Sequence, residues 1–263
     1  METNSTFRNG QQIFYTTNGK TGPWVTLING HTRPMSDFKQ LARFLSESGF
    51  RVICLDNRGS GSTEASEQFI LQDIADDILH IWEELSISQS HIMGISMGGM
   101  IAMAISTEHS NRILSVVLVS TTHLAQFNRS KDFEWPNDKV LIFEHLRSYV
   151  SINFATKNKL LLDAMAKQIL KNISKGSFQE QSQYQRKAIA KWLSENPDLK
   201  RITVPTLIIH GKEDQIIDCE AANILSSEIP KAESKLLEGV GHLILAESPK
   251  KLRDFALDFM KRY

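Results

Sequence analysis

The stretch HIMGISMGGMIAM, residues 91–103, decides the fold because a strand-like apolar run passes directly into a helical one. Ser96 stands at the junction, between Gly94 and Gly98. A strand-to-helix turn this sharp strains its central residue and projects that side chain beyond the sheet, so the residues two positions away must lack bulk. An ordinary helix-capping serine would explain Ser96 but not both glycines. The pattern therefore predicts an exposed serine oxygen beside the free N–H groups of a helix start.

Short apolar runs rich in β-branched residues alternate with stretches of helical periodicity along most of the chain. This alternation is typical of the α/β class, a mostly parallel central sheet flanked by helices. The predicted strands are residues 12–16, 24–29, 51–56, 91–95, 113–120, 206–210 and 234–237. The predicted helices are residues 36–47, 69–85, 96–108, 219–228 and 249–261.

The alternation stops over residues 121–200, where amphipathic runs such as KLLLDAMAKQILKN and YQRKAIAKWL follow one another without a strand. We expect a core domain of residues 1–120 and 201–263, with residues 121–200 inserted as a helical cap. The insertion is rich in aromatic residues, which could pack it onto the core domain or line a cavity between the two. They are Phe127, Phe133, Trp135, Phe143, Tyr149, Phe154, Phe178, Tyr184 and Trp192.

The composition argues against several classes of protein. The 263 residues carry 30 Lys plus Arg and 30 Asp plus Glu, so no net charge attracts the chain to nucleic acid or an anionic membrane. No apolar run approaches the roughly 18 residues of a membrane span, and the polar start METNSTFRNGQQ lacks the pattern of a secretory signal. Cys54 and Cys219 are too few and too differently placed for a disulfide framework or a metal site. We expect a cytoplasmic protein with two reduced thiols.

A serine hydroxyl becomes a nucleophile when a base takes its proton, and a carboxylate usually orients that base. The segment TLIIHGKED provides Asp214 after one predicted strand, and LLEGVGHLILAESP provides His242 after the last. Both positions follow the carboxyl ends of strands, where open α/β sheets place their sites. Of the competing carboxylates, Glu213 adjoins Asp214, and Asp218 fits better as the N-cap of the helix that follows.

The remaining histidines are weaker candidates for the base. His210 is the most tempting, but its place at the end of a predicted strand suggests a packing residue. His242 follows Gly239 and Gly241, which indicate a turn that could carry its side chain back to the sheet edge. The other histidines fall on predicted helices, at a strand start or in the insertion: His80, His91, His109, His123 and His145.

Five segments in this order resemble the α/β-hydrolase fold superfamily, in its serine-nucleophile branch with a helical cap, which includes esterases and lactonases. They are NGHTRP, DNRGSGST, GISMGG, PTLIIHGKED and GVGHLILAESP. The resemblance implies Ser96 as nucleophile, His242 as base and Asp214 as its orienting acid. Members with an aspartate nucleophile are disfavoured because Ser96 occupies that position.

The same resemblance implies an oxyanion hole formed by two backbone N–H groups, those of Met97 and of a residue in NGHTRP. That second donor is His31 or Thr32, with His31 favoured, although Asn29 stands where the family often has histidine. Removing one such donor costs about 2.7–4 kcal/mol of transition-state stabilisation. Arg58 in DNRGSGST invites a substrate-binding interpretation, but Gly59 and Gly61 favour a structural turn.

These expectations describe a hydrolase that transfers the acyl group of a small or medium carboxylic ester to water without a cofactor or metal. A lactonase or a carbon–carbon bond hydrolase could use the same groups, and a ligand-sensing protein with little turnover could retain them. Catalysis needs neutral His242, so we expect kcat/KM to decline on acidification through roughly pH 6–7.

Overall fold

The computed structural model describes residues 3–129 and 134–263. Its eight strands form one sheet in the order β1-β2-β4-β3-β5-β6-β7-β8. The strands from β4 to β8 in that order pair in parallel, whereas β1 and β2 pair antiparallel at one edge. The strand bounds are β1 Thr3–Arg8, β2 Gln11–Asn18, β3 Trp24–Ile28, β4 Arg51–Leu55, β5 Ser90–Ile95, β6 Ile113–Val119, β7 Thr206–Gly211 and β8 Ala232–Leu237. The predicted α/β class is confirmed.

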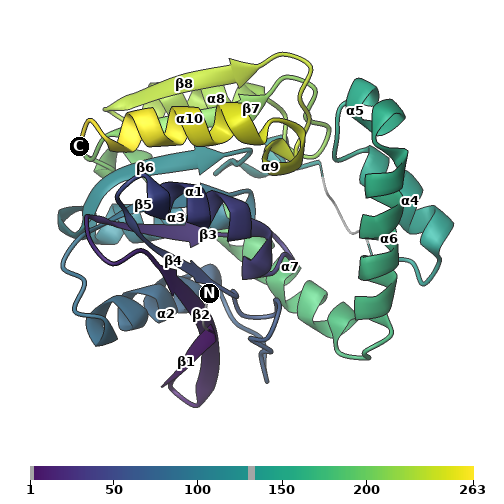
Figure 1. The fold of residues 1–263 in the computed structure, drawn as a ribbon, viewed down its shortest axis with the longest axis horizontal. Helices are drawn as coiled ribbons and strands as arrows, with labels where there is room; N and C mark the ends of the chain where they lie inside the picture. The colour runs from purple at the N-terminus through teal and green to yellow at the C-terminus, as the bar shows by residue number, and fades with distance from the viewer. Residues whose placement is uncertain (1–2, 130–133) are drawn as a thin grey trace.

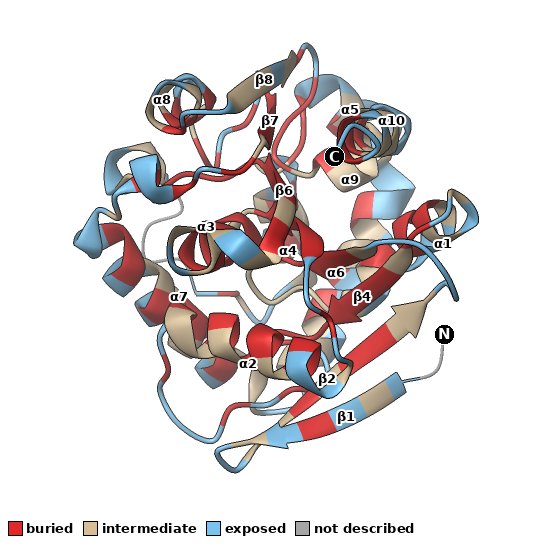
Figure 2. Cartoon of the chain, turned by 90° about the vertical axis from the view of Figure 1, so that its left-hand side faces the viewer, coloured by how far each residue is buried: buried red, intermediate tan, exposed pale blue. Residues whose placement is uncertain are grey.

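Helices cover both faces of the sheet because alternate strand residues point to opposite sides. On one face, Ile53 and Ile92 pack with α2 (Leu71–Glu84), α3 (Met97–Glu108) and α8 (Glu220–Glu228). On the other, Val52 and Met93 pack with α1 (Lys39–Glu47) and α10 (Pro249–Met260). Figure 2 shows the central strands β4 and β6 as buried between these layers. Apolar side chains on both faces explain why these strands read as continuous apolar runs.

Among the described residues, four α-helices lie between β6 and β7 in the chain: α4 (Lys139–Arg147), α5 (Ile152–Lys157), α6 (Lys159–Ile173) and α7 (Phe178–Glu195). Figure 1 shows the parallel strands pointing with their carboxyl ends toward α4, α5 and α6, while α7 runs back under the sheet. Trp135, Ile142 and Leu162 belong to a separate apolar cluster within the insertion. Trp192 of α7 instead packs into the core beside α2 and α3. The predicted aromatic Phe133 lies outside the described residues.

The short connecting helices complete the chain. A 3-10 turn, η1 (Met35–Phe38), precedes α1, and α9 (Ile244–Glu247) follows the last strand. Three further 3-10 turns are η2 (Ser110–Arg112), η3 (Ala125–Phe127) and η4 (Leu199–Arg201). The predicted helices end within about two residues of the observed ones, except that the first begins with η1 rather than with α-helix, and His109 lies just past α3 rather than within it.

Strand β1 is the strand that the sequence pattern did not predict. Strand β1 is largely polar, with residues TNSTFR, and its exposed edge needs no apolar alternation. It pairs with β2 through a hairpin whose two turn residues, Asn9 and Gly10, have φ of 49° and 80°. An Asn-Gly pair is the strongest short-range hairpin signal, because both residues tolerate positive φ. That dipeptide was the sequence feature that could have revealed β1.

Candidate active site

Ser96 occupies the sharp turn between β5 and α3. Its φ of 54° and ψ of −117° fall in a region that non-glycine residues rarely adopt. A Cβ on Gly94 would come within 2.1 Å of Gly98 O, and one on Gly98 within 2.1 Å of Ile28 O. The two glycines therefore allow the chain to turn against itself and against β3, as the sequence predicted. Ser96 is partly exposed, while the residues on either side of it are buried.

Ser96, His242 and Asp214 come together at the carboxyl edge of the sheet, although 146 residues separate the first two. Ser96 Oγ lies 3.2 Å from His242 Nε2, and His242 Nδ1 lies 2.8 Å from Asp214 Oδ2. A carboxylate can only accept, so Nδ1 carries the proton and Nε2 has a lone pair free to accept from the hydroxyl. The arrangement is a continuous row of hydroxyl, imidazole and carboxylate.

The Asp214 carboxylate is fully engaged by donors. Its Oδ1 accepts the N–H groups of Ile216 and Ile217 at 2.8 and 2.9 Å. Its Oδ2 accepts from His242 and also lies 3.1 Å from His210 Nε2. Burial by itself would raise the pKa of Asp214, but the attraction of His242 and the hydrogen bonds from both histidines outweigh it and hold the pKa well below its usual range. Asp214 is therefore ionised at neutral pH.

His210 is buried at the end of its strand, as expected of a packing residue, but its ring also bonds to Asp214. His210 is fully buried at the end of β7, and its Nε2 lies 3.1 Å from both Asp214 Oδ2 and Ile217 O. Both neighbours are acceptors, so Nε2 must carry the proton and donate. The four-residue separation of His210 and Asp214 was visible in the sequence, but only the turn after β7 brings the two side chains together.

The alternatives for the acid occupy other positions. Glu213 is exposed, whereas Asp214 is 4% exposed. Asp218 accepts the Glu220 N–H at 3.0 Å and pairs with Arg129. Helix α8 begins at Glu220 with Cys219 as its N-cap, so the prediction that Asp218 is the N-cap was wrong by one residue. Asp218 still satisfies one of the free N–H groups at the start of this helix.

The loop after β3 passes beside Ser96. Gly30 lies so close that a Cβ there would be 3.3 Å from Ser96 Cβ. Asn29 holds the loop from within, accepting the Gly30 N–H at 2.9 Å and donating to Pro34 O at 2.9 Å. The amide of Asn29, whose Nδ2 also donates to Asp37 Oδ2 at 3.3 Å, thus acts as both acceptor and donor where the family often has histidine. The Arg33 N–H closes a turn on Gly30 O at 3.2 Å.

Helix α7 holds the same loop from outside. Thr32 has a φ of 59°, and its N–H is donated to Gln185 Oε1 at 2.7 Å. His31 Nε2 lies 3.0 Å from Ser182 O, which fixes the proton on Nε2 because a carbonyl can only accept. Burial is the largest of the effects that lower the pKa of His31 to about 4, so the ring is neutral. The Thr32 N–H is engaged elsewhere, and this favours His31 as the second backbone donor.

A second set of contacts joins the insertion to the turn that contains His242. Tyr149 O accepts the N–H groups of His242 and Leu243 at 2.9 and 3.0 Å, and the Tyr149 ring packs edge-on against the His242 imidazole with centroids 5.7 Å apart. Glu247 reinforces this junction by accepting the N–H groups of Ser151 and Gly241 at 2.8 and 3.0 Å. The sequence could not predict these contacts, because no sequence pattern relates residues 149–151 to residues 241–247.

The Arg58 side chain forms a buried ion pair within the core domain. Its Nε and Nη2 donate to the two oxygens of Asp77 in α2 at 2.6 and 2.8 Å. Asp77 is 1% exposed and also lies 3.3 Å from Arg8 in β1. A bidentate pair of this kind fixes the guanidinium, which agrees with the expected turn and not with a substrate-binding side chain.

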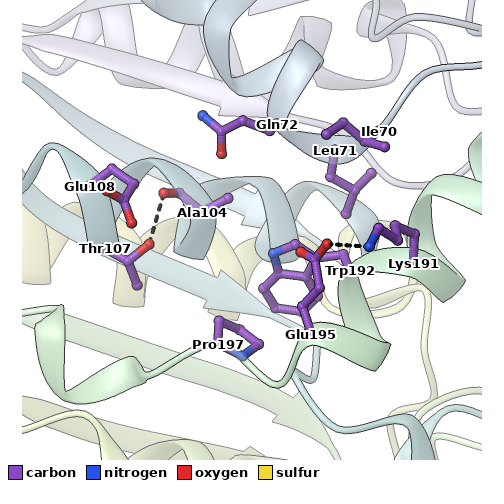
Figure 3. Close-up of a pocket in the computed structure, with 10 residues that line it drawn as sticks. All are labelled: Ile70, Leu71, Gln72, Ala104, Thr107, Glu108, Lys191, Trp192, Glu195 and Pro197. Carbon is purple, nitrogen blue, oxygen red and sulfur yellow. Dashed lines mark hydrogen bonds and ion pairs between the residues drawn. The ribbon is translucent and has the colours of Figure 1, made fainter.

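Two hollows in the described part of the chain are lined by residues other than Ser96. A cavity of about 140 Å³ lies between α2, α3 and the end of α7, where Lys191 pairs with Glu195 and Thr107 donates to Ala104 O (Figure 3). A larger one of about 550 Å³ borders Asp214.

Among the described residues, no group of three or more His, Cys, Asp and Glu side chains is arranged to hold a metal ion, and no helix is long and apolar enough to cross a membrane. Cys54 and Cys219 are free thiols.

The sequence matches the alpha/beta hydrolase fold family over residues 23–249. The chain belongs to this family. It is 24% identical to the human monoacylglycerol lipase ABHD6 over 95% of this chain and 79% of that protein. It is 26% identical to 3-oxoadipate enol-lactonase 1 of Acinetobacter baylyi over 82% of this chain and 80% of that protein. The predicted membership in the superfamily, and with it the hydrolase class, is confirmed.

A solved structure supports the fold independently. MGS-M2, an alpha/beta hydrolase enzyme from a deep-sea metagenome library of the Medee basin, superposes with a TM-score of 0.88. It covers 99% of this chain and 98% of its own at 17% sequence identity. At that identity, the likeness establishes the shared architecture of sheet, helices and insertion.

Proposed function

We propose that this protein is a serine hydrolase that cleaves a small or medium carboxylic ester through an acyl-enzyme. The observation that carries the proposal is the unbroken hydrogen-bonded row from Ser96 Oγ through His242 to Asp214 Oδ2. Partial exposure of Ser96 supports a substrate-accessible nucleophile, and the ionised Asp214 supports a base held in one tautomer.

The proposed reaction has two stages. Ser96 Oγ attacks the ester carbonyl carbon while His242 Nε2 takes the hydroxyl proton, and the backbone N–H groups of Met97 and His31 stabilise the oxyanion. His242 then gives this proton to the leaving alkoxide, and the acyl group stays on Ser96. Water, deprotonated by Nε2, attacks the acyl-enzyme, the carboxylic acid leaves, and the proton returns to Ser96 Oγ.

We also propose that residues 121–200 act as a cap that encloses the substrate between α4–α6 and the carboxyl edge of the sheet. The contact of Tyr149 with the His242 ring supports this role, because a residue of the insertion then borders the reacting groups. Such enclosure favours a largely apolar acyl compound.

A lactone is the second candidate substrate, favoured by the similarity to a protein named 3-oxoadipate enol-lactonase. In that case the leaving alkoxide stays attached to the acyl group, and one product forms instead of two. A panel of p-nitrophenyl esters, enol-lactones and diketone substrates ranks the ester, lactone and carbon–carbon reactions by kcat/KM.

The site assignment is tested with a serine-directed fluorophosphonate followed by peptide mapping. We expect the label on the peptide that contains Ser96, and we expect Ser96→Ala to lose both labelling and ester turnover while its unfolding curve stays close to that of the wild type. A label confined to another serine would reject the proposed nucleophile. Ligand binding without multiple turnovers would instead identify a sensor built on the same fold.

A further inference from the structure

We infer that Gln185 of α7 is a positioning residue that sets the second donor of the oxyanion hole, and this inference rests on the proposed function. The geometric basis is the Thr32 N–H, which donates to Gln185 Oε1 at 2.7 Å. This N–H belongs to the peptide plane next to the one that carries the His31 N–H. Holding the Thr32 N–H in α7 leaves the His31 N–H as the donor for the oxyanion.

The Gln185 amide is itself held in place, so it can act as a fixed anchor. Gln185 is fully buried, and its Nε2 donates to Arg58 O at 2.6 Å and to Ser60 Oγ at 2.8 Å. The Arg58 carbonyl can only accept, so it determines which end of the amide is nitrogen and therefore directs Oε1 at Thr32. All the polar groups of the side chain are thereby used.

The conformation of Thr32 explains why the loop needs this anchor. A φ of 59° is costly for a β-branched residue and persists only where its surroundings enforce it. The neighbouring His31 ring adds a second tie to the same helix, through Ser182 O at 3.0 Å. Without the bond to Gln185, we expect Thr32 to relax toward negative φ and turn the adjacent His31 N–H away from the oxyanion.

The helix supplies its own control, one turn away. Gln181 is also buried, at 5% exposure, and its amide forms two hydrogen bonds with the backbone of Ala65, at 2.8 and 2.9 Å. Gln181 therefore connects α7 to the core domain as Gln185 does, but it touches no residue of the 30–33 loop in these bonds. Gln181→Met and Gln185→Met each remove two or three hydrogen bonds from equivalent places on one helix.

The experiment compares the two variants with the wild type in ester turnover, unfolding by urea, and affinity for an aryl trifluoromethyl ketone. This ketone forms a tetrahedral adduct with an activated serine and therefore reports on oxyanion binding. For Gln185→Met we expect kcat to fall about 10- to 100-fold with KM changed less than about threefold, since outright removal of a donor costs about 10²- to 10³-fold. The ketone should bind more weakly by a similar factor. For Gln181→Met we expect a similar loss of stability with kcat within about twofold of the wild type.

Gln185→Asn provides a second test in case the methionine variant does not fold. It keeps the polarity but withdraws the amide oxygen by one carbon–carbon bond, and the same loss of kcat is expected. Equal kcat values for the Gln181 and Gln185 variants, or a loss confined to KM, would overturn the positioning role. A wild-type protein that neither turns over esters nor binds the ketone at Ser96 would overturn the proposed function itself, which is a different outcome.

Discussion

The Asp214 carboxylate is a buried charge that hydrogen-bond donors stabilise from every side. Four donors surround it: two backbone N–H groups on Oδ1, and two imidazoles on Oδ2. Only one of these donors, His242, also reaches Ser96. The other imidazole, His210, stabilises the charge and fixes the orientation of the oxygen to which His242 is bonded.

We predict that His210→Leu lowers the free energy of unfolding by about 1–3 kcal/mol, because a buried carboxylate loses a charge-assisted hydrogen bond. Ester kcat should fall about tenfold or more, equivalent to about 1.4 kcal/mol, as Asp214 gains freedom to turn. His210→Gln, which keeps an N–H donor, should retain more activity. Urea unfolding and steady-state kinetics measure both effects. Unchanged kcat in His210→Leu would return His210 to the packing role first expected of it.

The residues of the proposed active site were predictable because each stands in a recognisable local sequence pattern. Ser96 stands between two glycines, and Asp214 and His242 follow apolar strands in polar, glycine-containing turns. The residues that hold them were not predictable. Gln185 and Tyr149 act through contacts that depend on how the insertion folds back over the sheet, and periodicity alone contains no such information.

At the scale of elements, the strands with apolar residues on both faces were readily predicted, whereas the polar edge strand β1 was not. Its function is partly to extend the sheet beyond β2 and partly to bring Arg8 to α2. Together with Arg58, Arg8 surrounds Asp77, so that one buried carboxylate connects an edge strand, the turn after β4 and a helix.

We predict that Arg58→Met lowers the free energy of unfolding by about 3 kcal/mol, because Asp77 is 1% exposed and loses its bidentate partner. Substrate KM should remain within about threefold of the wild-type value. Asp77→Asn removes the buried charge instead of leaving it without its partner, so it should lower the free energy of unfolding less. A large rise in KM with little change in stability would support the substrate-binding interpretation of Arg58.

At the scale of the whole molecule, the apolar interior has separate parts. The two clusters that sandwich the sheet extend along its length, while Ile142, Leu162 and their neighbours form another cluster inside the insertion. Regions with their own small core open at lower free energy than the central strands. The insertion and the sheet should therefore differ in stability, although α7 is shared between them.

Hydrogen exchange provides the measurement. We predict that amides in α4, α5 and α6 exchange through openings of lower free energy than amides in β5 and β6. The C-terminal half of α7, which contains Trp192, should follow the sheet because it packs in the main core. Equal protection across the insertion and the central strands would show that the molecule opens only as one unit.

Acid should destabilise the whole protein through buried neutral histidines. His91 is 1% exposed, its Nδ1 lies 2.8 Å from Ser115 Oγ, and burial lowers its pKa to about 4. Between the ordinary histidine pKa of about 6.5 and this lower value, the unfolded chain binds a proton that the folded chain does not. The stabilisation is therefore complete above pH 6.5 and is lost as the pH falls toward 4.

We predict that the loss of unfolding free energy between pH 7 and pH 5, measured by urea unfolding, is smaller by about 2 kcal/mol in His91→Gln than in the wild type, since each pKa unit corresponds to about 1.4 kcal/mol. Glutamine can still bond to Ser115 but cannot titrate in this range. The same pH dependence in both proteins would mean that His91 contributes no proton linkage.

The bonds from His242 and Leu243 to the Tyr149 carbonyl have a consequence for protein engineering. Cap exchange between relatives is an obvious route to new substrate selectivity, and its success depends on where the splice points fall. A transplant that replaces residues 149–151 also replaces the carbonyl that binds the backbone of His242, the proposed catalytic base, whereas one limited to the surfaces of α4 and α6 leaves these hydrogen bonds intact. Changes on α4 and α6 should therefore alter substrate selectivity without altering turnover, whereas an exchange that includes residues 149–151 should alter both.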